Sequence, residues 1–417
     1  MFLNVLNISS VVSSGLCTGC GACAYMSAGE FEMTDVPEFG RRPKLTRGTT
    51  ADEASSRALQ ACPGIELHHT FDRRDPALIH ELTSAWGPVI KVWEGYAADP
   101  EIRYGGSSGG AASALALYAI EQEKMHGVLH IAARPDAPYL NHTILSTMRQ
   151  ELLANTGSRY APASPCEGLQ MIADAPAPCV FIGKPCDVAA AGKAAVIRPD
   201  LGKNIGLTIA MFCAGTPSTA GTLEMLRRMG IDDPSKLISL RYRGRGWPGK
   251  ATAVVRLPDG GERTMQLGYE ESWGEILTKH VQWRCRLCPD HTGEFADIAV
   301  GDPWHIPRAA DDPGRSLIVA RTRRGRQIVE GAISAGYLTA SEADPRNIAK
   351  SQPSLLKVRA SVWGRMMACR IMGVPVPHYV GIPLFVNWFN YLSLKEKAQS
   401  FAGTIRRVFR RGLWRST

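Results

Sequence analysis

Short apolar runs alternate with helical patterns through the middle of the chain, from about residue 105 to residue 336. A Gly/Ser loop followed by an Ala/Leu-rich stretch predicts a helix within residues 105–122. Five apolar runs are bounded by turn residues and predict buried strands, at 127–133, 179–183, 205–215, 251–257 and 296–304. Residues 315–336 predict a strand, a turn and an amphipathic helix. Strands that alternate with helices indicate an α/β or α+β class with a mixed, largely parallel sheet.

The same pattern divides the chain into four segments. Residues 1–70 are rich in cysteine and short on regular structure. Residues 71–104 form a predicted connector, and residues 105–345 carry the strand and helix pattern. Residues 346–417 form a helical C-terminal region that ends in a basic tail.

Composition and charge narrow the class of protein. The chain has 417 residues, 45% hydrophobic and 21% charged, which is ordinary for a globular protein of two or three domains. The net charge is +9, but residues 394–417 carry seven Lys and Arg against one Glu. Because the charge belongs to a tail, we expect no nucleic-acid partner. The apolar N-terminus lacks the basic region of a signal peptide, and no run is long enough to span a bilayer, so we expect a cytoplasmic protein.

The tail predicts a basic amphipathic helix, because apolar residues recur at helical spacing with arginines between them. The apolar positions are Phe401, Ile405, Val408, Phe409, Leu413 and Trp414. Three interpretations remain open. The helix lies on an anionic membrane surface at the inner face, docks on an acidic protein such as a ferredoxin, or packs as a solvated terminal helix. Membrane contact would suit a lipid-linked substrate.

Three cysteines in the string CTGCGAC form the first chemical motif. Cys17, Cys20 and Cys23 are three apart, and the pair Cys62-Pro63 follows at a distance. This is the bacterial ferredoxin arrangement, in which four thiolates hold a 4Fe–4S cluster. Zinc is the alternative, although structural zinc sites usually use two separated Cys-x-x-Cys knuckles. A two-cluster ferredoxin would continue with a further Cys-Pro, but Ser27-Ala28 occupies that place, so this segment predicts one cluster.

A second set of cysteines lies where predicted strands end or in a Cys-x-x-Cys pair: Cys186, Cys213, Cys285 and Cys288. Strand ends share one edge of an α/β sheet, so these thiols could converge on a second four-cysteine site. They could equally be buried thiols together with a redox pair. Cys166, Cys179 and Cys369 have no such setting and are interpreted as core or surface thiols.

Three glycine-containing strings are candidates for binding anions or rings. GGSSGG at 105–110 precedes the predicted helix, whose free N–H groups favour an anion, although a flexible loop is an equal alternative. RYRGRGWPG at 241–249 combines arginines with Trp247, and GSRY at 157–160 is similarly ambiguous. Asp302 and His305 follow a predicted strand and are candidate catalytic groups, with a turn residue and a surface histidine as the alternatives.

Taken in order, these strings resemble the coenzyme F-420 hydrogenase/dehydrogenase beta-subunit family over residues 15–340. They are CTGCGAC, SSGG before a helix, GSRY, GKPC, the FC pair at 212–213, RGRGWPG, RCRLCPD and ADIAVGDPW. The family includes 7-hydroxymethyl chlorophyll a reductases, vinyl reductases and bacterial members associated with polysaccharide biosynthesis. The resemblance implies an oxidoreductase with FAD and one or two 4Fe–4S clusters.

For this chain the resemblance implies a ferredoxin-like 4Fe–4S module at 1–70 and an FAD-binding catalytic domain at 105–345. It implies electron flow from a ferredoxin-type or deazaflavin donor to a small-molecule or lipid-linked acceptor. The alternatives are a non-catalytic electron-transfer subunit and a zinc-stabilised scaffold protein. The implied flavin-binding residues are Ser107, Ser108, Gly109, Gly110, Ser158, Arg159, Tyr160, Lys184, Arg241, Arg243, Gly244, Gly246 and Trp247.

Overall fold

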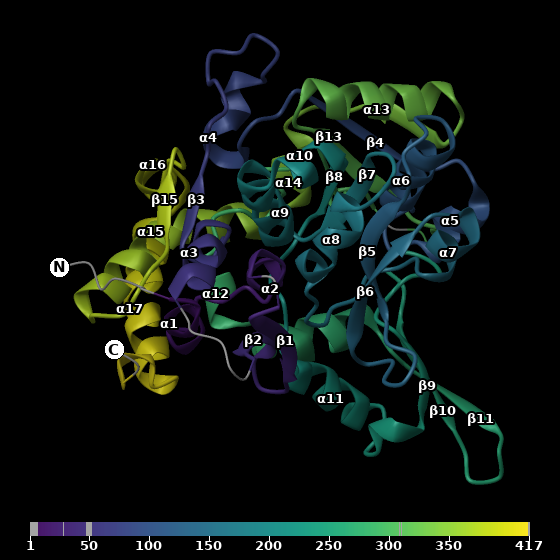
Figure 1. Cartoon of the computed structure of the whole chain (residues 1–417), viewed down its shortest axis with the longest axis horizontal. Coiled ribbons are helices and arrows are strands. Elements are labelled where there is room, and N and C mark those ends of the chain that lie inside the picture. Colours follow the sequence, from purple (N-terminus) through teal and green to yellow (C-terminus); the bar gives the residue numbers. More distant parts are fainter. Residues whose placement is uncertain (1–6, 28, 47–51, 308, 310, 416–417) are drawn as a thin grey trace.

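An eight-stranded mixed sheet organises the protein (Figure 1). The structure is a computed structural model that describes residues 7–27, 29–46, 52–307, 309 and 311–415. In order across the sheet, the strands are β14 (Leu338–Glu342), β4 (Lys91–Ala97), β13 (Ser316–Ala320), β12 (Ile298–Gly301), β8 (Ile205–Met211), β7 (Cys179–Gly183), β5 (Val128–Ala133) and β6 (Asn141–Ser146). The central strands β12, β8, β7 and β5 run parallel, and every other neighbouring pair is antiparallel. The predicted mixed sheet is therefore confirmed, with its parallel part limited to the centre.

Helices cover both faces of this sheet. One face carries α6 (Ala111–Glu121), α7 (Arg149–Ala154) and α13 (Arg323–Ser334), and the other carries α8 (Leu169–Ala173), α9 (Pro185–Ile197) and α10 (Pro199–Asn204). Successive strand residues alternate between the two cores. Val180 packs with the α6 layer, while Phe181 packs with the α9 layer. Burial on both faces explains why these strands are continuous apolar runs in the sequence.

The cysteine-rich N-terminal segment holds more regular structure than its sequence suggested. It contains α1 (Ile8–Ser13), α2 (Ala22–Met26), β1 (Phe31–Val36), β2 (Gly40–Leu45), α3 (Asp52–Gln60) and β3 (Glu66–His68). β1 and β2 form an antiparallel hairpin, and β3 pairs in parallel with β15 (His378–Val380). The chain just after Cys62-Pro63 is thereby joined to the C-terminal region. Residues 1–6, which include part of the apolar N-terminus, and Ala28 lie outside the described residues.

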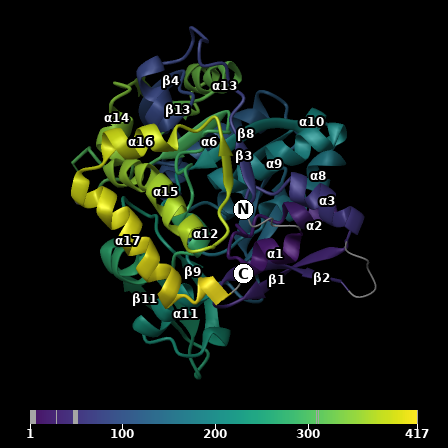
Figure 2. The same ribbon diagram turned by 90° about the vertical axis from the view of Figure 1, so that its left-hand side faces the viewer.

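The C-terminal region is helical, as the sequence predicted, and packs across one side of the molecule (Figure 2). It contains α14 (Asn347–Ser351), α15 (Pro353–Ile371), α16 (Leu384–Tyr391) and α17 (Leu394–Arg410). Ser393 and Glu396 form a capping box at the start of α17. α17 buries Ser400, Thr404 and Val408 against its neighbours and leaves Phe409 exposed. The buried face is thus the small-residue side of the helix, and residues 416–417 of the tail are outside the described part.

A smaller antiparallel sheet extends from the body as an arm (Figure 1). It consists of β9 (Leu237–Arg241), β10 (Ala251–Arg256) and β11 (Glu262–Leu267), and α11 (Thr219–Arg228) packs against its base. The segment 71–104 contains the short α4 (Thr83–Trp86) and α5 (Pro100–Gly105), and it supplies β4 to the main sheet between β14 and β13.

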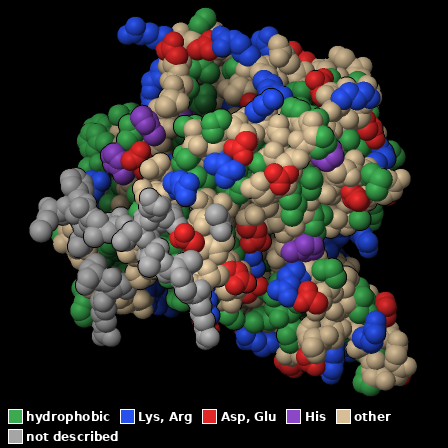
Figure 3. Space-filling view, in the orientation of Figure 1, with side chains coloured by type: hydrophobic (Ala, Val, Ile, Leu, Met, Phe, Trp, Pro, Cys, Tyr) green, Lys and Arg blue, Asp and Glu red, His purple; other side chains and the backbone are tan. Residues whose placement is uncertain are grey.

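Charge is distributed without a single dominant sign over the face in Figure 3, where acidic and basic side chains are interspersed. Among the described residues, none of the helices combines the length and the apolar character needed to cross a bilayer. The basic segment at residues 394–417 is the local concentration of charge that the sequence shows.

Candidate functional site

A cavity of about 290 Å³ opens at the edge of the sheet where the parallel strands end. Its walls include Ile182 and Gly183 from the end of β7, Met211 at the end of β8, and Gly301 at the end of β12. The carboxyl ends of parallel strands are the usual place for a ligand in such a sheet. The sheet topology, rather than any one motif, therefore positions the cavity.

The GGSSGG loop and the first turn of α6 form one wall of the cavity. Ser107, Ser108 and Gly110 line it together with Ala111. Gly109 does not line it, and its backbone has a φ of +70°. A Cβ at Gly109 would lie 2.8 Å from the Cα of Arg315, so only glycine fits there. This close packing fixes the loop, and the free N–H groups of α6 open toward the cavity.

The GSRY string forms the adjoining wall. The Ser158 backbone N–H donates to Ser107 Oγ over 2.6 Å, which ties the two loops together. Arg159, Tyr160 and Ser158 all line the cavity. Arg159 donates to the Leu240 carbonyl over 3.0 Å, so its guanidinium also fixes the arm.

A buried ion pair closes the third side. Arg243 donates to both carboxylate oxygens of Asp302, over 2.9 and 2.8 Å, and Trp247 Nε1 donates to Asp302 Oδ1 over 2.7 Å. Trp247 stacks on Trp304 with ring centroids 5.3 Å apart. Because Asp302 is already fully engaged, the geometry gives it the role of a cavity wall that positions Arg243 and Trp247.

The remaining predicted site residues are placed differently. Lys184 lines the cavity and forms an ion pair with Asp187, 2.6 Å away. Arg241 donates to the Gly105 carbonyl over 2.9 Å, so it supports the loop from outside the cavity lining. Gly244, Gly246 and Trp247 also do not line it. His305 does not line it either, and its ring contacts Ser351 Oγ at 2.6 Å and Glu94 at 3.3 Å.

The first four cysteines lie near one another. Burial raises the pKa of Cys23 well above its usual value, and the nearby Cys17, Cys20 and Cys62 raise it further. Burial likewise raises the pKa of Cys62 to about 12. A hydrogen bond with Cys166 lowers the pKa of Cys20 to about 7. The four thiols are therefore close enough to act on one another's pKa, and Gly19 N–H donates to Cys17 Sγ over 3.4 Å.

The second four cysteines converge as well. Burial raises the pKa of Cys213 to about 12, and Cys285 and Cys288 are among the groups that act on it. Burial, then Asp187, raises the pKa of Cys186, on which Cys213 and Cys288 also act. The Thr216 N–H donates to Cys285 Sγ over 3.4 Å. These four thiols come from β8, α9 and α12 (Trp283–Arg286) or the loops beside them, so only the folded chain brings them together.

Cys213 links the second thiol set to the cavity, because it belongs to the set and also lines the cavity wall. Arg284 links the two thiol sets. Its Nη2 donates to the carbonyl of Pro63, next to Cys62, over 2.9 Å. Burial lowers the pKa of Arg284, but Tyr379 and then Cys288, Cys186 and Cys285 raise it above its usual value.

Two nitrogens of Arg284 lack a hydrogen-bond partner among the described residues. The side chain is 2% exposed, and these nitrogens are Nε and Nη1. A buried guanidinium with free N–H groups calls for an anionic group beside it. Within the described ranges, no three His, Cys, Asp or Glu side chains lie close enough together to hold a single metal ion. An iron–sulfur cubane binds each thiolate through a different iron, so its ligands stand further apart.

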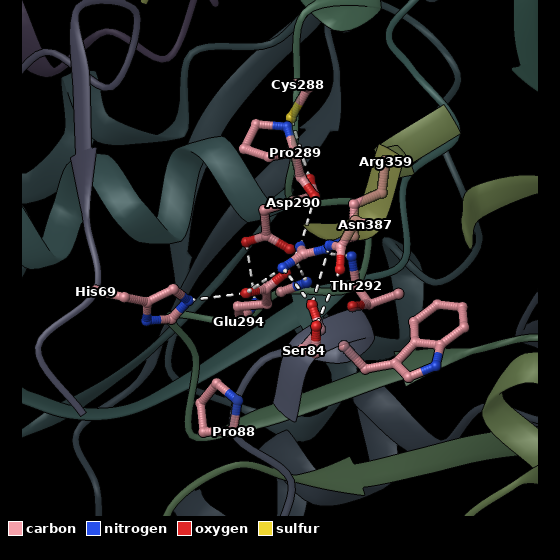
Figure 4. Close-up of polar contacts among 12 residues, drawn as sticks. His69, Ser84, Pro88, Cys288, Pro289, Asp290, Thr292, Glu294, Arg359 and Asn387 are labelled. Atoms are coloured by element: carbon pink, nitrogen blue, oxygen red, sulfur yellow. Dashed lines mark hydrogen bonds and ion pairs between the residues drawn. The ribbon is translucent and has the colours of Figure 1, made fainter. Parts of the chain in front are cut away.

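A buried charge network supports the loop that carries Cys288 (Figure 4). Glu294 forms an ion pair with Arg359 of α15, and its Oε2 accepts a hydrogen bond from His69 Nε2 over 2.8 Å. Arg359 also donates to the Pro289 carbonyl over 2.7 Å. Burial would raise the pKa of Glu294, but Arg359 and His69 lower it to about 2. The C-terminal region therefore holds the Cys285–Cys288 loop in place through a fully buried ion pair.

Several residues of the site were not expected from the sequence. Asp187, His130, Tyr269 and Trp273 line the cavity without belonging to a motif, and Gln352 reaches it from the C-terminal region. Gln352 Nε2 donates to the Asp302 carbonyl over 2.7 Å. Arg284 lies in WRCRLCPD, where charged residues flank the Cys-x-x-Cys pair and could have drawn attention. The Glu294–Arg359 pair joins residues 65 positions apart, so the sequence carries no signal for it.

Comparison with known proteins relates most of this chain to one family. Residues 92–170 match the N-terminal region of the coenzyme F420 hydrogenase/dehydrogenase beta subunit, and residues 178–346 match its C-terminal region. All four cysteines of the second thiol set and most of the cavity wall fall inside these matches. The helices α15, α16 and α17 lie outside them.

Individual relatives are distant. The chain is 26% identical over 269 residues to the F420-dependent formate dehydrogenase 1 subunit beta of Methanococcus maripaludis, covering 63% of this chain and 65% of that protein. It is 24% identical over 298 residues to the coenzyme F420 hydrogenase subunit beta of Methanococcus voltae, covering 68% and 95%. A chain of the F420-reducing NiFe hydrogenase complex of Methanosarcina barkeri has a similar fold, with a TM-score of 0.52 and 20% identity over 72% of this chain and 98% of that chain.

Proposed function

Because the chain belongs to the coenzyme F420 hydrogenase/dehydrogenase beta-subunit family, we propose that it is an iron–sulfur flavoprotein oxidoreductase. In this proposal a ferredoxin-type or deazaflavin donor supplies electrons, which reach an organic acceptor at the cavity. The observation that carries the proposal is the position of Cys213, which lies both in the second thiol set and in the cavity wall.

The thiol sets fit iron–sulfur clusters in their chemistry. Each set offers four cysteines, and backbone N–H groups donate to Cys17 and Cys285 as they do to cluster sulfurs. The unpartnered N–H groups of Arg284 would face the negative charge of the thiolates. We assign Cys17, Cys20, Cys23 and Cys62 to one cluster, and Cys186, Cys213, Cys285 and Cys288 to another.

In this proposal the cavity would hold a flavin, which would exchange single electrons with the clusters and a hydride with an acceptor. Ser107, Ser108, Gly110 and the start of α6 would hold its phosphates, because backbone N–H groups at a helix N-terminus favour anions. Arg243 and Trp304 would bound the ring end, where Arg243 lies 5.5 Å from the Trp304 ring centroid. The aromatic wall of Trp304, Tyr269 and Trp273 would exclude water.

Anaerobic purification followed by iron, sulfide, zinc and flavin analysis tests the proposal. We expect about eight irons and one FAD per chain. Cys213→Ser should lose about half of the iron, whereas Cys369→Ser, a buried thiol outside both sets, should lose none. Zinc without flavin would contradict the proposal and favour a zinc-stabilised scaffold.

A second candidate is a non-catalytic electron-transfer subunit of a larger redox complex. It is favoured by the relatives, which are named as beta subunits of a formate dehydrogenase and of hydrogenases. Protein that carries iron and flavin but reduces no organic acceptor by itself would support this candidate. A role in polysaccharide biosynthesis, with a small-molecule or lipid-linked acceptor, is a narrower proposal that acceptor screening would test.

A further inference from the structure

Five arginines gather where the C-terminal helices cover the second thiol set. We call them the arginine surface: Arg286 of α12, Arg365 of α15, Arg407 and Arg410 of α17, and Arg411, which follows α17. Figure 2 shows α15 and α17 on the side of the molecule that faces the viewer, with α12 near one end of α15. Arg407, Arg410 and Arg411 are exposed, while Arg286 and Arg365 are half-buried. The surface therefore combines a fixed base with outer side chains that reach into solvent.

Hydrogen bonds hold the base of this surface in place. Arg365 Nη1 donates to the Arg286 carbonyl over 2.8 Å, and Arg286 Nη2 donates to the Thr278 carbonyl over 3.3 Å. Arg411 Nη2 donates to the Val281 carbonyl over 3.2 Å. Three elements far apart in the sequence are thus joined at one place by guanidinium groups.

The charge of the arginine surface is not neutralised within the chain. In the described part of the protein, no Asp or Glu forms a salt bridge with any of its five members. Burial lowers the pKa of Arg365 to about 10, and the charges of Arg407 and Arg286 add to this. Arg365 Nε also has no hydrogen-bond partner within the ranges that the structure describes. Unpaired cations that repel one another favour an anionic partner from outside.

This surface is next to one particular thiol. Cys285 directly precedes Arg286 in α12, and Arg411 donates to the carbonyl of Val281, four residues before Cys285. Cys285 also acts on the pKa of both arginines, so it lies near these two side chains. Phe409, 59% exposed, and Trp414 lie beside the arginines, with ring centroids 6.4 Å apart. Arginine and aromatic side chains are enriched at protein–protein interfaces. An aromatic contact adds apolar binding energy to the electrostatic attraction of such a surface.

We propose that the arginine surface is the docking site for an acidic one-electron carrier protein, such as a ferredoxin with a strongly negative surface, and that Cys285 is the thiol of the second set that lies nearest to this carrier. The inference rests on the proposed function and adds the face that meets the partner. Cys285 would hold, together with the other thiols of its set, a group that accepts one electron at a time from the carrier, with no bond made or broken. Two docking events would supply the pair of electrons that the acceptor needs.

The C-terminal helices give this proposal its specificity. Two of the three elements that build the surface, α15 and α17, lie outside the residues that match the family. The same α15 carries Arg359, which fixes the loop of Cys288. One helical region therefore both encloses the second thiol set and presents the charge beside it.

Carrier binding tests the proposal without relying on turnover. The probe is an oxidised, strongly acidic 2Fe–2S ferredoxin, titrated by calorimetry at low ionic strength and again at about 0.5 M salt. Arg407→Glu/Arg411→Glu should weaken binding about tenfold or more at low salt, and the difference should shrink at high salt. Arg407→Lys/Arg411→Lys, which keeps the charge, should retain most of the affinity.

A matched control reverses two exposed arginines on the arm, Arg256→Glu/Arg263→Glu, which changes net charge by the same amount far from α17 (Figure 1). This control should bind the ferredoxin with wild-type affinity. Equal affinities for the two double-Glu variants would overturn the docking site. So would loss of binding to phosphatidylglycerol vesicles in Arg407→Glu/Arg411→Glu with unchanged ferredoxin affinity, because the surface would then serve a membrane.

Iron analysis of the same preparations separates this inference from the proposed function. Protein that carries iron but does not bind ferredoxin would overturn the docking site and leave the proposed function standing. Protein that purifies without iron or flavin would overturn the proposed function, and the electron route through Cys285 with it.

Discussion

Replacing Arg359 by methionine should destabilise the protein and change how its stability depends on pH. Arg359 is 3% exposed and its main charged partner, Glu294, is 3% exposed, so the pair is fully enclosed (Figure 4). Arg359→Met keeps most of the side-chain volume but removes the ion pair of Glu294, whose contact with His69 Nε2 remains. Removing one member of a buried pair costs about 3–5 kcal/mol, because the remaining charge is left uncompensated.

The pKa of Glu294 gives an independent magnitude. It is about 2 in the folded protein, against 4.5 for the unperturbed group. A difference of roughly 2.5 units corresponds to about 3 kcal/mol. Because the folded-state pKa is lowered, this stabilisation is present above pH 4.5 and is lost as the pH falls toward 2. The wild type and Arg359→Met should therefore differ most near neutral pH and converge in acid.

Guanidinium unfolding followed by tryptophan fluorescence, at about pH 7 and about pH 3, measures this difference. Arg370→Met is the control, because Arg370 is exposed on the same helix, and it should change the free energy of unfolding by less than about 0.5 kcal/mol. A loss below about 1 kcal/mol for Arg359→Met, or an equal loss at both pH values, would refute the reasoning. Iron content of the variant reports whether the loop of Cys285 and Cys288 loosens with the pair.

Three further predictions concern the cavity and the tail. Asp302→Ala should destabilise the protein by about 3–5 kcal/mol and lower flavin retention, because Arg243 is left buried without its carboxylate. Thermal unfolding and the flavin-to-protein ratio measure these effects, and unchanged values would contradict the prediction. Gly109→Ala should lower the melting temperature far more than Gly230→Ala. Both glycines have positive φ, but only at Gly109 would the added Cβ meet backbone atoms within 3 Å. Equal shifts in melting temperature would show that this contact does not determine the cost of the substitution. Phe409→Ser should leave the free energy of unfolding within about 0.5 kcal/mol of wild type, because the ring is exposed, whereas Val408→Ser should cost about 1–3 kcal/mol in the same unfolding assay.

Features that depend on neighbouring residues could be predicted from the amino-acid sequence. The apolar runs predicted β5, β7, β8, β12 and β13, because strands buried on both faces are apolar throughout. They also predicted β10, which buries alternate residues in the arm. The Gly/Ser loop predicted the start of α6, since glycine is needed where φ is positive. The CTGCGAC string brought Cys17, Cys20 and Cys23 together, because residues three apart in a tight loop cannot separate.

Contacts between distant segments emerged from the folded chain alone. The sequence grouped Phe409 with Val408 as apolar positions of one helix, but α17 packs through Ser400, Thr404 and Val408, because small side chains allow close approach to α15 and α16. The sequence offered Asp302 as a catalytic candidate, and its partners Arg243 and Trp247, 59 and 55 residues away, are set by the fold. The meeting of Cys213 with the cavity and of Cys285 with the arginine surface depends on strand order and helix packing. Spacing along one chain carries no information about such contacts, because they are set by which buried faces pack together.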